Sequence, residues 1–418
     1  MDIYKQIIFS ENKFNILLIS LLPVSLLFGT FVSEIIIFLI IFFFLYKMVL
    51  LKNFKFLFNS IFYITVLIYC YLLFNLTIST NFDLSFNRSV YFIRFPLLAM
   101  AIAYFIKKNN FDSTIIYKVW GATIGIVIFD LYFQYFFGFN LLGFKSPAPY
   151  RLSSFLGEEL KIAHLLIGFA MHVIIFNYVA NKNNKIFYLL IIIYLIILLL
   201  INERSNAVKG ILIITLSYLL INNIKIKEKF FVTIIFLSTI FSIIYFNDKV
   251  NQRFYNEIKK MKLDNNKVSE YIKKSNYGPY YLSGYEVFKK NPYFGSGIKT
   301  FRKVCNDVDL NKYYKNETYY KDLHLRKCNS HPHQIHIEIL SELGLFGYFL
   351  FIIFFIYLFV KAFNIYIKKK NLNILCPILF VFTQYLPLLP SGSFFTNFGA
   401  IIFWINVGLI YSEIIKYE

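Results

Sequence analysis

Residues 331–363 read HPHQIHIEILSELGLFGYFLFIIFFIYLFVKAF and join a polar head to a long apolar run. The run from Ile337 is long enough to cross a bilayer, whose hydrocarbon core of roughly 30 Å takes about 20 apolar residues of helix. Three of the chain's six histidines, His331, His333 and His336, lead into this run. Polar side chains gathered at the mouth of a membrane helix indicate chemistry at a membrane surface.

Apolar runs of spanning length recur along the whole chain of 418 residues, which is 58% hydrophobic and 21% aromatic. Because the runs are continuous and do not alternate, they predict membrane helices and not a β-barrel. We therefore expect an all-α polytopic membrane protein with about 12 transmembrane helices. The expected spans are residues 14–31, 33–51, 58–77, 88–106, 115–138, 159–180, 185–202, 205–222, 230–246, 337–363, 373–390 and 396–414. The first run is expected to be a retained helix and not a signal peptide.

Lysine-rich short loops alternate with loops that lack lysine. The lysines are Lys52 with Lys55, Lys107 with Lys108, Lys182 with Lys185, Lys225 with Lys227 and Lys229, and Lys368 to Lys370. Positive residues gather on the cytoplasmic side of membrane proteins, so these loops and both termini are predicted to be cytoplasmic. The opposite side then holds one large loop, residues 247–336, between helices 1–9 in residues 1–246 and helices 10–12 in residues 337–418. Loops of this length are uncommon without a function.

The large loop is basic, with 18 Lys and Arg against 9 Asp and Glu, in a chain of formal net charge +20. Such a loop suits an anionic partner such as a phosphate, a pyrophosphate or an acidic glycan. The alternative is a solvated, lysine-rich loop with no such partner. Nucleic acid is not expected as a partner, because the loop lies on the non-cytoplasmic side.

Two of the four cysteines, Cys305 and Cys328, lie in the large loop, 23 positions apart. In an oxidising compartment this pair is a candidate disulfide that would fix the approach to the histidines. Two free thiols or a metal site are the alternatives. Cys70 and Cys376 lie inside apolar spans and are expected to be core residues.

Arginines mark possible anion sites on the outer side. Arg204, in INERSNAVKG, lies at the amino-terminal mouth of the expected helix 205–222. A helix N-terminus and a guanidinium together can bind a pyrophosphate, although Arg204 could instead simply pair with Glu203. Arg151, in PYRLSSFLGEEL, and Arg302 could converge with it on one outer cavity. Arg88 and Arg94 are weaker candidates for the same role.

The spacing of His333, Gln334, nine residues, Gly344, two residues and Gly347 resembles the signature of the O-antigen ligase and polymerase superfamily. The order of the other elements is similar to that family over most of the chain. These elements are the large loop before the histidine helix, the Arg at an earlier helix mouth, NPYFGSGIKTF at residues 291–301, and RLSSFLGEE at residues 151–159. The resemblance implies an enzyme that moves a glycan from undecaprenyl diphosphate to an acceptor hydroxyl, at the periplasmic face of the bacterial inner membrane.

The resemblance also implies roles for individual residues. His333 would be the base that takes the acceptor's proton, and Arg204 would bind the diphosphate together with Arg151 or Arg302. His331, His336, Gln334, Gly344 and Gly347 would support this site, with the two glycines allowing close helix contact. We expect a metal-independent, inverting membrane glycosyltransferase without a cofactor. The favoured activity is a ligase that uses a lipid A-core sugar as acceptor, and the alternative is a polymerase that joins repeat units on the carrier.

Two other interpretations stay open at this point. A zinc site could use His331, His333, His336 and Cys328, although H-x-H-x-x-H does not match a common zinc motif. A transporter could also have twelve spans, and it would be expected to show charged residues near the midplane and internal repeats. The polar residues predicted inside spans are Asp130, His164 and His172.

Overall fold

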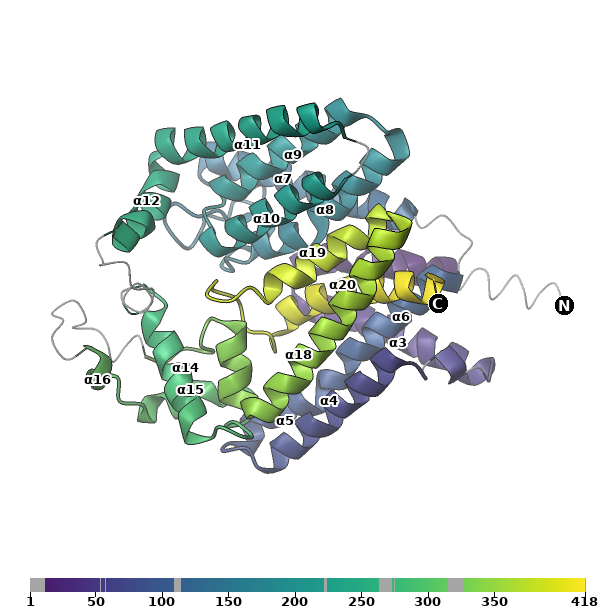
Figure 1. Cartoon of the computed structure of the whole chain (residues 1–418), viewed down its shortest axis with the longest axis vertical. Coiled ribbons are helices and arrows are strands. Elements are labelled where there is room, and N and C mark those ends of the chain that lie inside the picture. Colours follow the sequence, from purple (N-terminus) through teal and green to yellow (C-terminus); the bar gives the residue numbers. More distant parts are fainter. Residues whose placement is uncertain are drawn as a thin grey trace.

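A computed structural model describes residues 12–52, 54–56, 58–108, 114–221, 224–262, 273, 275–314 and 327–417. Helices make up nearly all of the regular structure, and none of these residues forms a β-strand (Figure 1). The expected all-α fold is therefore confirmed. Residue 222, which ends one expected span, and parts of the expected loop 247–336 lie outside the described residues.

The described helices follow one another along the chain with short connections. The first half contains α2 (Leu22–Leu27), α3 (Thr30–Leu50), η1 (Phe54–Phe56), α4 (Ser60–Thr77), α5 (Phe82–Val90), η2 (Tyr91–Ile93), α6 (Arg94–Lys108), α7 (Thr114–Phe137), η3 (Ser154–Leu156), α8 (Ile162–Asn181), α9 (Asn184–Leu200) and α10 (Arg204–Leu220). The second half contains α11 (Ile226–Phe246), α12 (Asp248–Lys262), α14 (Gly278–Lys290), α15 (Phe301–Val304), η4 (Cys305–Asp307), α16 (Asn311–Tyr314), α18 (Ile335–Lys369), η6 (Leu372–Ile374), α19 (Leu375–Gln384) and α20 (Asn397–Tyr417).

Eight helices within the described residues are long and apolar enough to cross a membrane. Three further apolar helices, residues 12–27, 184–200 and 372–384, are shorter, and α10 has only 17 residues. The expected span 373–390 is shorter in the structure because α19 ends at Gln384, and Pro387 and Pro390 lack the N–H groups that would continue the helix. A membrane protein with several spans agrees with these helices, and the count of twelve stays a prediction.

The centre of the bundle is α20, of which 83% is buried over its most apolar 18 residues. It packs along α6 and also contacts α8, α18 and α19. At Gly408 the backbones come so close that an added Cβ would lie 3.0 Å from the Ala99 carbonyl oxygen. Small residues permit this kind of helix approach inside a membrane.

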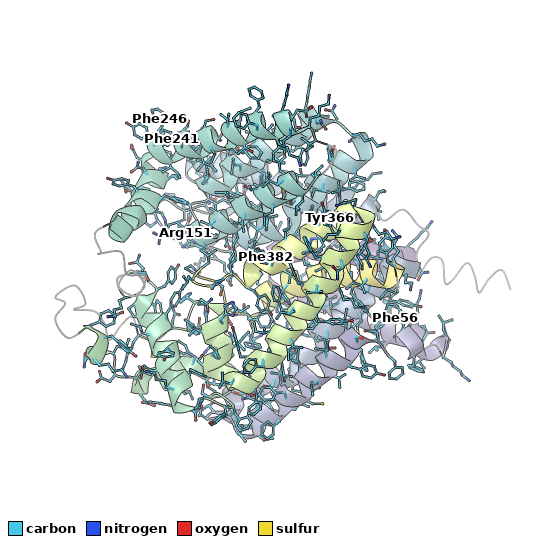
Figure 2. All side chains as sticks on the ribbon, in the orientation of Figure 1. Phe56, Arg151, Phe241, Phe246, Tyr366 and Phe382 are labelled. Carbon is cyan, nitrogen blue, oxygen red and sulfur yellow. A yellow bond between two sulfur atoms is a disulfide. The ribbon has the colours of Figure 1, made fainter. Side chains whose placement is uncertain are left out.

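The outer surface of the bundle carries large apolar side chains. In α11 only 11% of the corresponding stretch is buried. Figure 2 labels Phe241 and Phe246 on this helix, and these side chains are 66% and 78% exposed. A helix that exposes such side chains along its length suits a lipid environment and not water.

The polar residues inside the expected spans contact the protein's own helices and loops. Asp130 of α7 accepts a hydrogen bond from the Ser154 hydroxyl, which holds the loop before α8 against the bundle. The imidazole Nε2 of His172 lies 2.8 Å from the side-chain oxygen of Asn406 in α20. His164 packs against an aromatic ring of α19. These contacts account for the three residues as structural parts of the bundle.

The helix α18 is kinked at Gly344, where φ is +67° and the backbone is not helical. Residues 291–297 cross the helix at this point and bind its free backbone groups. The Leu345 N–H donates to the Pro292 carbonyl at 2.8 Å, and the Gly297 N–H donates to the Glu342 carbonyl at 2.8 Å. The kink therefore leaves these groups paired, as buried backbone groups must be.

The two glycines of the motif have different roles in this kink. At Gly347 an added Cβ would lie 2.8 Å from the ring of Tyr71 in α4, so the expected close helix contact exists there. At Gly344 the close neighbour is the carbonyl oxygen of Tyr293, in the crossing loop, at 2.3 Å from an added Cβ. The helix contact expected for Gly344 was therefore wrong, because the loop occupies that side of the helix.

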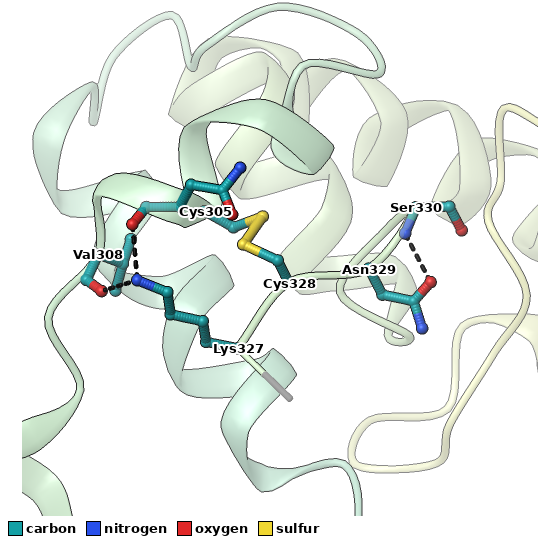
Figure 3. Close-up of a disulfide and its surroundings, with 7 residues drawn as sticks. Cys305, Val308, Lys327, Cys328, Asn329 and Ser330 are labelled. Atoms are coloured by element: carbon teal, nitrogen blue, oxygen red, sulfur yellow. Dashed lines mark hydrogen bonds between the residues drawn. A yellow bond between two sulfur atoms is a disulfide. The ribbon is translucent and has the colours of Figure 1, made fainter. Parts of the chain in front are cut away.

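A disulfide joins Cys305 to Cys328, with the two Cα atoms 5.4 Å apart (Figure 3). Cys305 is buried in a small core with Val287 and Phe301. Beside the bond, the Lys327 ammonium donates to the carbonyl of Val308 at 3.1 Å. The bond therefore fastens the segment before His331 to the α14–α15 region.

Replacing Cys305 with serine is expected to lower the free energy of unfolding by about 2–4 kcal/mol, because a cross-link over 23 positions restricts the unfolded chain. Melting temperatures measured in detergent, without reductant, check this. Cys70→Ser, at a free cysteine, is the matched control and should leave the melting temperature unchanged. Equal melting for both variants and for the parent would show that the two thiols are not bonded.

Candidate functional site

His333 lies at the junction between the large loop and α18, in a constrained backbone conformation. Its φ is +58°, a region that residues other than glycine rarely adopt. The Ser391 N–H donates to its carbonyl at 2.8 Å, and the next residue, Gln334, caps α18 by accepting the Ile337 N–H at 2.9 Å. The helix cap and the segment around Ser391 thus fix the direction in which the imidazole points.

His331 has both imidazole nitrogens engaged and is buried. Its Nδ1 lies 2.9 Å from the Ser330 hydroxyl, and its Nε2 lies 3.3 Å from the Ser391 carbonyl oxygen, which can only accept. Burial, followed by the charge of Lys299, lowers the pKa of His331 to about 4. The neutral ring packs on His333, with 4.2 Å between ring centroids. His331 therefore supports the neighbouring imidazole.

His336 is also held at both nitrogens. Its Nε2 donates to the Tyr385 carbonyl at 2.8 Å, and its Nδ1 accepts from the Tyr348 hydroxyl at 3.1 Å. These contacts tie the first turn of α18 to the end of α19. Neither imidazole nitrogen is left for a substrate, so His336 is a structural residue in this arrangement.

His333 differs from both, because its Nε2 meets an exposed group. The Asn329 side-chain amide donates to this nitrogen at 3.0 Å, and Asn329 is exposed. Burial and then the neighbouring His331 lower the pKa of His333 to about 3, so the imidazole is neutral near pH 7. The rings of Tyr277 and Tyr280 flank it, at 5.5 and 5.0 Å between centroids. A substrate hydroxyl that displaced Asn329 would therefore meet an imidazole lone pair.

A corner at Asn202 gathers three separate segments. Its φ is +64°, and its side-chain amide donates to the Tyr150 carbonyl at 3.0 Å and to the Lys249 carbonyl at 2.8 Å. These bonds draw the loop before α8 and the start of α12 to the beginning of α10. Each segment carries an arginine close to the bonded residue.

The three arginines Arg151, Arg204 and Arg253, called here the arginine trio, lie close together. The Arg204 Nη1 donates to the Arg253 carbonyl at 3.1 Å. Burial, then the like charges of Arg151 and Arg204, lower the pKa of Arg253. The buried Nε atoms of Arg151 and Arg253 have no hydrogen-bond partner within the described part of the chain. The trio thus holds concentrated positive charge with N–H donors to spare.

One carboxylate, Glu203, lies beside the trio. Its Oε1 is 3.8 Å from an Arg151 nitrogen. Burial raises the pKa of Glu203 to about 7, against the opposing effect of Arg151. Near neutral pH this carboxyl is therefore only partly ionised, and the trio keeps a net positive charge. The pairing of Arg204 with Glu203, expected as an alternative from the sequence, is replaced by pairing with Arg151.

Tyr277 connects the arginine trio to His333. Its ring contacts His333, and its hydroxyl is close enough to Arg253 to act on that group electrostatically. Figure 2 shows Arg151 beside the helix α12 that carries Arg253. An anion bound by the trio would therefore lie one aromatic side chain away from the imidazole of His333.

Sequence reasoning missed Arg253 and misplaced Arg302. The signal for Arg253 was the scarcity of arginine, since the chain has only seven among its 43 basic Lys and Arg residues. Arg302 is not part of the trio, and it lines a separate cavity together with Arg88 and Arg94. The expected convergence therefore includes Arg151 and Arg204, with Arg253 in the third place.

The side chains proposed as an alternative zinc site do not form one here. Cys328 is bonded to Cys305, and the nitrogens of His331 and His336 are used within the protein. Across the described ranges, no three His, Cys, Asp or Glu side chains are grouped so that they could hold a metal ion.

A comparison with the curated proteins found no match. Residues 162–352 match a family model described as O-antigen ligase. The matched stretch begins with α8, contains Arg204, Arg253 and His333, and ends within α18 after Gly344 and Gly347. The chain carries an O-antigen ligase domain, and it belongs to the O-antigen ligase superfamily.

Proposed function

We propose that the protein is a glycosyltransferase of the O-antigen ligase type. It moves a glycan from undecaprenyl diphosphate to a sugar hydroxyl of lipid A-core, at the periplasmic face of the bacterial inner membrane. The proposal includes twelve spans, cytoplasmic termini and a periplasmic loop 247–336. The observation that carries it is the pairing of His333, whose Nε2 faces an exposed group, with the adjacent arginine trio.

The reaction follows from this pairing. The acceptor hydroxyl oxygen forms a bond to the anomeric carbon, while the bond from that carbon to the diphosphate oxygen breaks. The electron pair leaves with undecaprenyl diphosphate, and the hydroxyl proton goes to the Nε2 of His333. Attack from the face opposite the leaving group inverts the anomeric centre. In this proposal no metal or cofactor takes part.

The base becomes stronger when the donor is bound. A pKa near 3 keeps His333 neutral and ready to accept a proton, but makes the free imidazole a weak base. A bound diphosphate brings negative charge close to the ring, and nearby negative charge favours the imidazolium and raises the pKa. Proton transfer is therefore promoted in the complex with the donor.

The arginine trio stabilises the leaving group. Charge grows on the diphosphate as the glycosidic bond breaks, and fixed guanidinium groups stabilise such charge without reorganising. Guanidinium groups also match phosphate oxygens in pairs. The supporting residues act on position: Gln334 caps the helix that follows His333, and His331 and His336 hold the surrounding segments.

Replacing Arg204 with glutamine is expected to raise the KM for the lipid-linked donor by about tenfold to a hundredfold, since a hydrogen bond to a charged group contributes about 1.5–3 kcal/mol. Initial rates with a purified, reconstituted protein and varied donor check this. Lys185→Gln, an exposed cation at the opposite end of α9, is the control and should leave the donor KM unchanged. An unaltered donor KM in Arg204→Gln would remove the trio from the diphosphate role.

A glycolipid gel from cells lacking this gene tests the function itself. Lipid A-core without polysaccharide, with long chains kept on the carrier, is the expected result for a ligase. Core that carries a single repeat unit would instead identify the polymerase of the same superfamily. A normal ladder would contradict both activities.

A further inference from the structure

A second basic cavity, of about 490 Å³, lies apart from the arginine trio. It is bounded by α5, the start of α6, the segment before α15 and the start of α20. Figure 1 shows α5 far from α10 and α12, with the first part of α18 between them. Ligand pockets commonly occupy about 300–1,000 Å³, so the cavity can admit a small polar group such as a substituted sugar. The mechanism proposed above does not use it.

The charges in this cavity are unequally compensated. Arg94 makes a two-pronged ion pair with Glu34, with nitrogen–oxygen distances of 2.9 and 3.1 Å. The Lys299 ammonium donates to the Ser393 hydroxyl and lies 3.9 Å from a carboxylate oxygen of Glu338. These two cations are therefore balanced by carboxylates.

The remaining two cations, Arg88 and Arg302, have no such balance. Arg88 donates a hydrogen bond to the neutral side chain of Asn397. Arg302 is exposed, and in the described part of the chain neither guanidinium has a carboxylate within ion-pair distance. Two uncompensated guanidinium groups in one cavity favour a phosphate or a carboxylate as the occupant.

The rest of the lining suits the sugar that would carry this anion. Asp83, in the first turn of α5, is exposed and makes no ion pair with the described residues, so its carboxylate can accept from hydroxyls. The Asn87 amide can both donate and accept. Tyr91 is 55% exposed and offers an aromatic face with a polar tip. The cavity thus combines anion binding with hydroxyl and ring contacts.

The cavity lies next to His333, on the side away from the arginine trio. Lys299 and Arg302 are close enough to His331 to act on it electrostatically, and the His331 ring packs on His333. On its other side, His333 contacts Tyr277, which leads to Arg253. The order from cavity to trio is therefore Lys299 and Arg302, then the two histidines, then Tyr277 and Arg253. A base between a donor site and a second polar site is the arrangement that transfer to an acceptor requires.

We propose that the cavity around Arg88 and Arg302 binds a phosphate or carboxylate substituent of the acceptor glycan, and so brings the acceptor hydroxyl to His333. This inference rests on the proposed function and adds the acceptor site to it. Arg302 supplies the exposed guanidinium, and Asp83 and Tyr91 contact the sugar. An acceptor without the anionic substituent would lose this contact while keeping its hydroxyl.

The test compares Arg302→Gln with Lys303→Gln in the reconstituted full-length protein. Lys303 is the adjacent exposed cation and does not line the cavity. The probes are lipid A-core, the same acceptor after dephosphorylation, and the same acceptor after reduction of its carboxylates. Initial rates are measured with the acceptor varied at saturating donor, and with the donor varied at saturating acceptor.

We expect Arg302→Gln to raise the acceptor KM by about tenfold or more, in line with the loss of one charge-assisted bond, while the donor KM stays within about twofold. Lys303→Gln should match the parent. Whichever treatment removes the recognised anion, phosphate or carboxylate, should make the parent as poor as Arg302→Gln. In a double comparison, the variant and that treatment should not add.

Three results would overturn the inference. An acceptor KM unchanged by Arg302→Gln would show that the cavity does not bind the acceptor, and a raised donor KM would assign the cavity to the donor. Parent protein that handles charged and uncharged acceptors equally well would exclude an anionic substituent. In each case the parent still transfers glycan, so the proposed function survives. Parent protein that transfers none with any acceptor would remove the proposed function and this inference together.

Discussion

Glycan transfer is expected to fall by about 10²–10⁴-fold when His333 is replaced by glycine, which is the usual size of a general-base contribution. Glycine is the informative replacement because the backbone at this position is left-handed, with φ at +58°, and glycine adopts that conformation without strain. The loss then reports the missing imidazole and not a distorted helix start. Rates of transfer with saturating donor and acceptor, together with an unchanged melting temperature, check the prediction.

Two controls separate base catalysis from packing. Imidazole added to the His333→Gly protein should restore part of the rate, since the deleted ring leaves space between Tyr277 and Tyr280. Asn329→Ala should change the rate by no more than a few fold, because in this account the substrate displaces that amide from Nε2. Full activity in His333→Gly would assign the base to another group.

The second large effect concerns stability. Gly344→Ala is expected to lower the free energy of unfolding by about 3 kcal/mol or more, through a disallowed backbone and a steric clash together. The φ of +67° disfavours any side chain, and the added Cβ would lie 2.3 Å from the Tyr293 carbonyl oxygen, which is backbone and cannot turn away. Because residues 291–297 pair with the helix here, the clash should also disturb the approach of Lys299 to α18.

Gly125→Ala is the matched control for this change. Gly125 lies within α7, and nothing lies within 4 Å of a Cβ added there. Alanine is favoured over glycine inside helices by about 1 kcal/mol, so this variant should melt at the same temperature as the parent or slightly higher. Thermal unfolding in one detergent measures both variants, and equal melting temperatures would show that the kink at Gly344 is not required.

Much of the fold could be predicted from the sequence because lipid restricts it so strongly. Continuous apolar runs leave helices as the economical solution, and the helices occur where those runs do. The ends were harder to place. The fourth expected span began at residue 88, whereas helical structure starts at Phe82, because the polar helix α5 precedes the apolar part. Similarly, the prolines after Gln384 end α19 earlier than hydropathy alone suggests.

The site could be predicted only in part, because its geometry depends on long-range backbone contacts. The motif indicated His333, but not that its Nε2 is the one facing an exposed amide, which follows from Ser391 and Asn329. Arg253 lies in a polar helix without an apolar pattern, and it joins the trio through the bonds of Asn202. Such a bond between residues 47 positions apart leaves no periodic signal in the sequence.

Lys299 illustrates the same limit within a recognisable motif. The segment NPYFGSGIKTF was noted for its similarity to the family, and its glycines suggested a tight loop. What the segment does in space is to cross α18 and to carry Lys299 between Glu338 and the second cavity. Only the structure connects that lysine to the turn after His333.

The most direct measurement of the central claim is a mass balance of transfer in vitro. Purified protein in lipid vesicles is mixed with glycan on undecaprenyl diphosphate and with lipid A-core, and both lipids are analysed by mass spectrometry. The account predicts that the core gains the mass of the donor glycan and that free undecaprenyl diphosphate appears in equal amount. Core of unchanged mass, with the glycan still on its carrier, would contradict it.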